Sequence, residues 1–155
     1  MDYHLAQVNI AIARYACDDP RFAGFVDNLD RVYDLAESTP GFVWRHLTVN
    51  EDAEAKQVFG EANLIFNMSV WETQQALREF VYKSKHASIL RQRGDWFVPM
   101  NRPDFALWWQ PVGEIPTIVE SRHRLECLQQ AGPTEDAFTF RNIFEVPLAQ
   151  EIANG

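Results

Sequence analysis

Histidine, arginine and amide side chains are the residues of this sequence that can do acid–base and hydrogen-bonding chemistry on a small organic molecule. His86 can exchange protons near neutral pH, so it is the candidate general acid or base acting on an enol or phenol. Arg45 carries a planar guanidinium that pairs with a carboxylate or phenolate. The amides of Gln7, Asn9 and Asn67 can stabilise a developing oxyanion. We therefore predict His86, Asn9 and Arg45 as catalytic residues.

Each of these side chains also has an ordinary structural interpretation. His86 can be a helix-surface histidine that is hydrogen-bonded to the backbone, and Arg45 can form a salt bridge with an acidic neighbour. The amides can satisfy one another in a polar layer of the core, or simply face water. At the level of the sequence, both interpretations stay open.

Other kinds of chemistry are disfavoured because their motifs are missing. His4, His46 and His123 belong to separate predicted elements without the spacing of metal ligands, so we predict no metal site. There is no Ser-His-Asp arrangement, phosphate-binding loop or paired-carboxylate motif, which argues against hydrolases and nucleotide-dependent enzymes. Cys17 and Cys127 stand in unrelated contexts and are predicted to be reduced structural thiols. We expect no cofactor.

Length and composition favour an ordinary globular protein. The 155 residues, 46% hydrophobic and 23% charged, suit one domain over residues 1–144, followed by a tail over residues 145–155. The net charge of −8 argues against nucleic-acid partners and against anionic membrane surfaces. We expect no signal peptide, and no apolar run approaches the roughly 20 residues of a membrane span. We predict a cytoplasmic protein whose partner is a small-molecule substrate.

The elements that must position these side chains follow from periodicity and turn residues. Helices are predicted over residues 20–38, from 72 onwards, over 85–97 and over 117–130, and a loop over residues 50–56. Strands are predicted over residues 4–14, 42–49, 62–71, 105–112 and 136–144. This order predicts an α+β fold of the ferredoxin-like split βαβ type, an antiparallel sheet with helices on one face. A second copy is expected to cover the other face, giving a homodimeric α+β barrel.

Alternation along the strands separates two predicted sheet faces. One set is apolar and is assigned to the core or the dimer interface: Ala6, Val8, Ile10, Ile12, Phe42, Trp44, His46, Phe66, Met68, Val70, Phe105, Leu107 and Trp109. The opposite set mixes amides with tryptophans: Leu5, Gln7, Asn9, Val43, Arg45, Leu47, Ile65, Asn67, Ser69, Trp71, Ala106, Trp108 and Gln110. Apolar walls with a few oriented polar groups are typical of a pocket, here expected between Trp71 and Trp108. The predicted substrate-binding residues are Gln7, Asn67, Ser69, Trp71, Phe80 and Trp108.

The segment from Leu64 to Ile89 carries a family resemblance. The strand LIFNMSVW runs into the helix ETQQALREFVYKSKHASIL, and this combination resembles the antibiotic-biosynthesis monooxygenase superfamily of dimeric α+β barrels. Over residues 3–144 the chain resembles an uncharacterised bacterial family within it, through HLAQVNIA, PGFVWR, NMSVW, ALWW and GPT followed by AFTFR. The resemblance implies the fold. Superfamily members oxidise, isomerise, cyclise or merely bind small molecules, and the oxygenases among them work without metal or flavin.

One branch of that superfamily, the haem-degrading oxygenases, uses an asparagine on the first strand, a tryptophan on the helix and a histidine after it. Asn9 matches the asparagine, and His86 is the candidate for the histidine. Phe80 stands where the tryptophan would be, and a phenyl ring cannot supply the indole. Haem degradation is therefore the less favoured alternative.

Together these observations predict a cofactor-independent enzyme of monooxygenase or cyclase/isomerase type, acting on an aromatic or enolisable substrate of secondary metabolism. The alternative from another class is a non-catalytic small-molecule-binding protein of the same fold. Replacement of His86 separates the two, because only an enzyme has turnover to lose.

Overall fold

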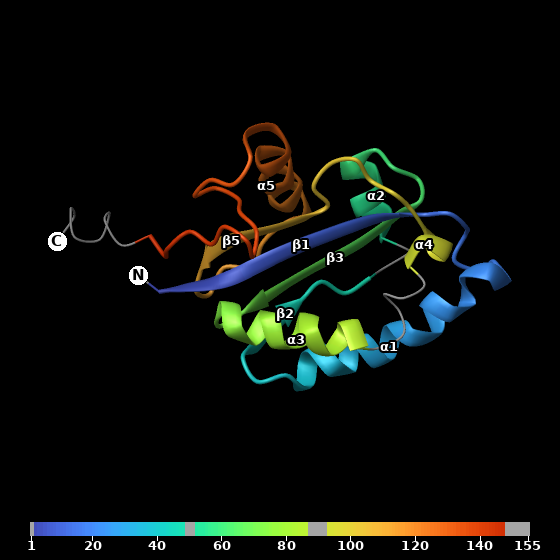
Figure 1. Cartoon of the computed structure of the whole chain (residues 1–155), viewed down its shortest axis with the longest axis horizontal. Helices are drawn as coiled ribbons and strands as arrows, with labels where there is room; N and C mark the ends of the chain where they lie inside the picture. The colour runs from blue at the N-terminus through green and yellow to red at the C-terminus, as the bar shows by residue number, and fades with distance from the viewer. Residues whose placement is uncertain (1, 49–51, 87–92, 148–155) are drawn as a thin grey trace.

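The computed structural model describes residues 2–48, 52–86 and 93–147, while the side chains of residues 84–86 and 93 lie outside the description. It is an α+β fold built on an antiparallel sheet that is not closed into a barrel (Figure 1). The strands are β1 (Tyr3–Ala13), β2 (Phe42–Arg45), β3 (Leu64–Trp71), β4 (Phe97–Val98) and β5 (Phe105–Pro111). The helices are η1 (Pro20–Phe22), α1 (Ala23–Ser38), α2 (Ala53–Phe59), α3 (Gln74–His86), α4 (Arg93–Trp96) and α5 (Ile118–Ala131).

Strand β1 lies at the centre of the sheet. It pairs with β3 along one edge and with β4 and β5 along the other, and β2 pairs with the far edge of β3. Every pairing is antiparallel. The long pairing of β1 with β3 sets Gln7 opposite Ser69 and Asn9 opposite Asn67, so these four side chains share one face, as the alternation predicts.

Helices cover both faces of the sheet, which corrects the prediction of helices on one face only. In Figure 1, α2 and α5 lie on one side of the strands, and α1 and α3 lie on the other. Packing agrees with this view: residues of α2 and α5 join one buried cluster with the sheet, and residues of α1 and α3 join another. We call the two sides the α2/α5 face and the α1/α3 face.

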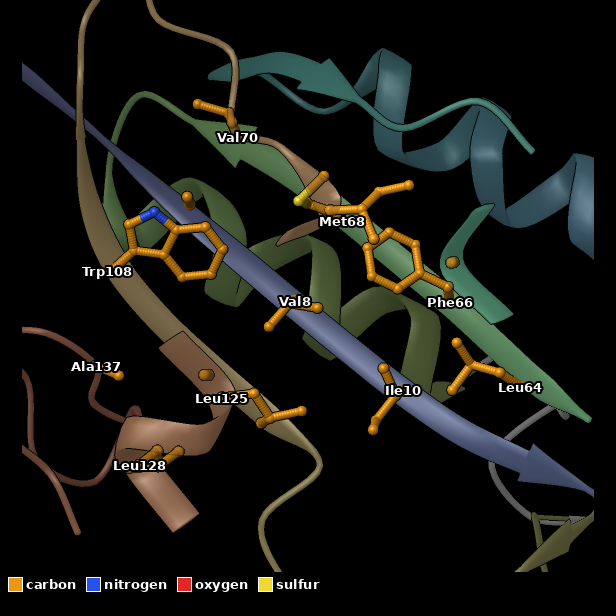
Figure 2. Close-up of a cluster of buried hydrophobic side chains, with 14 residues drawn as sticks. Val8, Ile10, Leu64, Phe66, Met68, Val70, Trp108, Leu125, Leu128 and Ala137 are labelled. Atoms are coloured by element: carbon orange, nitrogen blue, oxygen red, sulfur yellow. The ribbon is translucent and has the colours of Figure 1, made fainter. Parts of the chain in front are cut away.

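The α2/α5 face holds the main hydrophobic core. Figure 2 shows β1 and β3 side chains packed against Leu125 and Leu128 of α5. Val8 is 0% exposed and Phe66 is 3% exposed, so the chain's own helices already cover this face. The prediction that a second copy covers this face is therefore wrong, because helices of the same chain already keep these side chains out of water.

The α1/α3 face holds two separate hydrophobic clusters. One gathers around Trp71 and Leu107 and includes residues of α3 and of the segment after α5. The other gathers around Phe22, Phe25 and Trp96 at the start of α1 and near β4. This face is therefore buried at its two ends by different groups of side chains.

The predicted faces of all β5 residues and of Phe42 are wrong, because the register between strands, and not the alternation within one strand, decides them. Asn9 lies opposite Phe105, which places Leu107 and Trp109 on the α1/α3 face and Trp108 on the α2/α5 face. An irregularity between Phe42 and Trp44 shifts the register of β2, so Phe42 lies opposite Trp71. Trp44 and Arg45, which follow the bulge, keep their predicted sides.

Helix ends follow their local signals. The Asp19 carboxylate accepts hydrogen bonds from the backbone N–H and the side chain of Arg21, and Pro20 occupies the first turn. The side-chain hydrogen bond from Arg21 lowers the pKa of Asp19 from 3.8 to about 2. Nearer the other end of the chain, the Thr117 hydroxyl caps α5 by accepting a hydrogen bond from the backbone N–H of Glu120. Helix α5 ends at Ala131, before Gly132.

Four predicted elements differ from the structure. The predicted strand 42–49 ends at Arg45, and the predicted loop 50–56 contains the start of α2. The signal missed there is a run of good helix formers, AEAKQVF, that stops at Gly60 in the left-handed conformation (φ 71°). Residues 136–144 form only isolated bridges, because tight turns at 134–137 and 139–142 fold the segment back on itself. Of the predicted helical piece 85–97, residues 93–96 form α4 and residues 97–98 form β4, while 87–92 lie outside the described residues.

Within the described ranges, no helix combines the length and the apolar composition needed to cross a membrane.

Replacing Gly41 by alanine should destabilise the fold by about 2–3 kcal/mol, because two costs add. Gly41 has a φ of +93°, where a side chain is strained, and its new Cβ would lie 2.5 Å from the Cβ of Ala76. Gly113→Ala is the matched control: its φ is +91°, but nothing lies within 4 Å of the new Cβ. Urea unfolding of both variants should show the larger loss for Gly41→Ala, and equal losses would contradict the steric term.

Candidate functional site

Polar side chains form a band across the α1/α3 face of the sheet. We define the polar band as Gln7, Asn9, Asn67 and Ser69, which occupy two neighbouring rows of β1 and β3. Gln7 and Ser69 are 3% and 4% exposed, and both asparagines are partly buried. The band is therefore a polar layer inside the molecule and not a water-facing strand surface.

Hydrogen bonds tie the band together. The Nε2 amide of Gln7 donates to Asn67 Oδ1 at 2.6 Å and to Ser69 Oγ at 2.7 Å. The indole N–H of Trp71 donates to the same Ser69 oxygen at 2.8 Å. Both hydrogens of the Gln7 amide are thus used, and the Gln7 side chain is held in one orientation.

Several polar atoms of the band keep unused hydrogen-bonding capacity. Within the described part of the chain, Gln7 Oε1, Asn67 Nδ2 and the Asn9 amide make no side-chain hydrogen bond. The only fully enclosed side-chain polar atom without a partner, among the described residues, is the Nε of Arg124, on another part of the molecule. Gln7 is only 3% exposed, so the accessible surface of the band comes mainly from the partly buried Asn9 and Asn67.

The band separates the two hydrophobic clusters of this face. Leu5 and Trp71, on one side of it, belong to the cluster around α3. Ala13 and Ile65, on the other side, belong to or pack against the cluster at the start of α1. Amides between two apolar clusters are the combination that binds and orients a small organic molecule.

Trp71 and Phe80 pack against each other next to the band. Their rings stack with centroids 5.1 Å apart, and the ring of Phe42 meets Trp71 edge-on at 5.4 Å. Trp71 is fully buried. Its indole N–H donates to the Ser69 hydroxyl, and its ring packs against Phe80. Phe80 is partly exposed.

Arg45 shares the row of Ser69 and Gln7, so it lies on the predicted face. Its Nε donates to the Glu37 carboxylate at 2.8 Å, and its guanidinium lies over the ring of Tyr33, with 4.1 Å to the centroid. The predicted anion partner is therefore engaged by two side chains of α1, which is the salt-bridge interpretation of this residue.

Trp108 does not belong to the site, which corrects the prediction of a pocket between Trp71 and Trp108. Its ring is fully buried in the core of the α2/α5 face, with its indole N–H donating to Gln110 Oε1 at 2.9 Å (Figure 2). The two tryptophans lie on opposite faces because the β1–β5 register sets Ala6, not Gln7, opposite Trp108.

His86 is the last residue of α3, and its side chain lies outside the described part of the structure. Its assignment as general acid or base is therefore still a prediction. The same holds for the predicted absence of a metal. Among the described residues, no three His, Cys, Asp or Glu side chains are grouped as ligands.

The segment after α5 is a neighbour of the band that the sequence interpretation missed. The ring of Phe140 stacks on Phe105 with centroids 5.6 Å apart, and Phe105 lies opposite Asn9. Arg78 of α3 donates to the Phe140 carbonyl at 2.9 Å and lies over its ring at 4.6 Å. The alternating phenylalanines of AFTFR did indicate that this segment packs against the sheet, although we interpreted them as a strand.

Two surface cavities lie away from the band. One, of about 430 Å³, is lined by Pro133, Thr134, Glu135, Asp136 and Phe144, and the other, of about 200 Å³, opens between α2 and α5. Neither has a member of the polar band in its lining.

Comparison with known proteins gives a family match over most of the chain. The family described as a domain of unknown function, DUF3291, matches residues 4–154. No curated protein matches the chain. A crystal structure of a protein of unknown function from Nitrosomonas europaea has 12% sequence identity and a TM-score of 0.49, covering 74% of this chain and 96% of its own. Because the family match spans nearly all of the sequence, the chain belongs to the DUF3291 family.

Proposed function

We propose that this protein is a cofactor-independent small-molecule enzyme, of monooxygenase or cyclase/isomerase type, that binds an aromatic or enolisable substrate at the polar band. The observation that supports it is the unused hydrogen-bonding capacity of Gln7, Asn9 and Asn67 between two apolar clusters. Uncharged amides suit a phenol or enol, since they can hydrogen-bond both its neutral and its deprotonated oxygen.

The residues of the band would divide the work of binding. Asn67 Nδ2 would donate to the phenolate or enolate oxygen, and Gln7 Oε1 would accept from a neutral hydroxyl. Trp71 would act as a positioning residue, because it holds Ser69, which in turn fixes the Gln7 amide. Phe80 would pack against the ring of the substrate. His86 would remove or return the proton.

A non-catalytic binding protein is the second candidate, and two observations favour it. Arg45 is already paired with Glu37 and Tyr33. Among the described residues, no titratable side chain is hydrogen-bonded to the polar band. Such a protein would use the same amides to hold a ligand and would lack a group that moves its proton.

We also propose that the chain has a ferredoxin-like sheet of the antibiotic-biosynthesis monooxygenase superfamily and forms a homodimer. The order β2-β3-β1, with β5 on the other side of β1, supports the first point. Val112 and Ile115, between β5 and α5, are 48% and 63% exposed, and Val119 in the first turn of α5 is 62% exposed; together they offer an apolar contact surface for a second copy.

Light scattering at micromolar concentration should give twice the chain mass of 17.9 kDa. Val119→Asp should shift the protein toward the monomer, because it places a charge in the proposed contact. The exposed Leu47→Asp is the control on another part of the surface and should remain a dimer. A monomeric wild type would contradict the proposed dimer.

Gln7→Leu should weaken the binding of 2-naphthol, a planar phenol, by about tenfold, because it removes a hydrogen-bond acceptor and releases Asn67 and Ser69. Fluorescence titration of the ligand measures the change in Kd. Gln110→Leu is the matched control. Gln110 is buried like Gln7 and accepts a hydrogen bond from the Trp108 indole, but it lies on the α2/α5 face. It should cost similar stability and leave the Kd within about twofold. Equal weakening by both variants, or no binding to the wild type, would contradict a site at the polar band.

A further inference from the structure

The cavity of about 200 Å³ between α2 and α5 is a second place where a small molecule can bind. Its apolar floor is made by Ile10 of β1, Phe59 of α2 and Leu125 of α5. Ile10 and Leu125 are 3% and 1% exposed, so the apolar surface that a ligand can reach comes from the partly exposed Phe59. This cavity lies on the opposite face of the sheet from the polar band and is independent of the proposed function.

A tethered guanidinium stands at one side of this cavity. Arg122 donates from Nε to the Glu126 carboxylate at 2.8 Å and from Nη1 to the Val58 carbonyl at 2.9 Å. These two bonds connect α5 to α2 and hold the guanidinium at the cavity wall. Its Nη2 group, which neither bond uses, is left to donate to a ligand.

A second guanidinium comes from the loop between β4 and β5. Arg102 lines the cavity, is exposed and makes no hydrogen bond or ion pair with any described residue. Its loop is held on both sides: Gln129 of α5 donates to the Pro103 carbonyl at 2.8 Å, and Ile10 donates to the Asp104 carbonyl at 2.9 Å. The backbone that carries Arg102 is therefore fixed at the mouth of the cavity.

Two guanidiniums face one carboxylate here, in a chain whose net charge is −8. The local excess of positive charge favours an anion, and a guanidinium matches the two oxygens of a carboxylate. The partly exposed ring of Phe59 favours a ligand with a hydrophobic body. The volume is below the roughly 300–1,000 Å³ of a drug-sized pocket, so the ligand must be small.

We propose that this cavity binds a small organic carboxylate with an aromatic or branched aliphatic body. The carboxylate pairs with Arg102 and with the unused side of Arg122, and the body packs on Phe59.

Benzoate is the probe, and ligand-observed NMR with the full chain measures its binding. Benzoate should bind with a Kd of about 1 mM or tighter. Arg102→Gln should weaken it at least about tenfold, because it removes the charge and leaves the floor intact. Arg141→Gln, at an exposed arginine of the C-terminal segment, should leave the Kd unchanged.

Two further ligands separate the parts of the proposal. Benzyl alcohol, which lacks the charge, and acetate, which lacks the ring, should each bind at least about tenfold more weakly than benzoate. If acetate bound as tightly as benzoate, the cavity would attract any anion, and the proposed preference for a hydrophobic body would be wrong. Unchanged benzoate binding in Arg102→Gln, or no benzoate binding to the wild type, would overturn the proposal.

Discussion

Replacing His86 by alanine should slow proton removal from an enolisable substrate by about 10²–10⁴-fold, the usual contribution of a positioned general base. Oxygenation, cyclisation and isomerisation of such a substrate can all begin with this proton removal. It can be measured without knowing the natural substrate, as deuterium exchange at the carbon beside the carbonyl of 2-tetralone, followed by NMR in D₂O. This probe combines an aromatic ring with an enolisable ketone.

The control for this experiment is His123→Ala. His123 lies on the exposed surface of α5, away from the polar band, so its replacement should leave the exchange rate unchanged. The Kd of 2-naphthol should also be unchanged in His86→Ala, because this variant keeps the amides of the band. Exchange that is unaffected by His86→Ala would refute the acid–base role. A wild type that binds the phenol and accelerates no exchange would establish the binding-protein alternative.

Replacing Trp71 by alanine should cost about 3–5 kcal/mol of unfolding free energy, the usual range for deleting a buried aromatic side chain. Trp71 is 0% exposed and joins three elements: it stacks on Phe80 of α3, meets Phe42 of β2 edge-on and hydrogen-bonds Ser69 of its own strand. Its removal leaves a cavity and an incompletely satisfied polar band. The loss is comparable with the whole stability of a small domain.

Trp71→Phe separates packing from hydrogen bonding. It keeps an aromatic ring against Phe80 and removes the indole N–H, so its cost should be about 1–2 kcal/mol. Urea unfolding at equilibrium measures both variants. A loss of less than about 1.5 kcal/mol for Trp71→Ala would show that the stack is not a main contact between α3 and the sheet.

The polar band itself could be predicted from the sequence. Alternation along one strand is a local property, because successive side chains must point to opposite sides of the backbone. Gln7 and Asn9 therefore share a face, as do Asn67 and Ser69, and the antiparallel β1–β3 pairing brings the two pairs together. Helix ends were equally local: Asp19, Thr117 and Gly132 act on their own neighbours.

What the sequence left open depends on how separate strands are aligned. A shift of one residue moves every side chain of a strand to the other face, and nothing within a strand records its register. Trp108 is on the α2/α5 face because the pairing of β5 with β1 sets it opposite Ala6. Phe42 changed sides because of a bulge that follows the turn at Gly41.

The number of helical layers was also decided by tertiary structure. Val8 and Phe66 are apolar whether they face a second copy or the helices of their own chain, so the sequence predicted burial but not the partner. The structure supplies α2 and α5 as that partner. In the same way, the charge of Arg45 was visible in the sequence. Its pairing with Glu37, eight residues earlier in the chain, became visible only when α1 was packed beside β2.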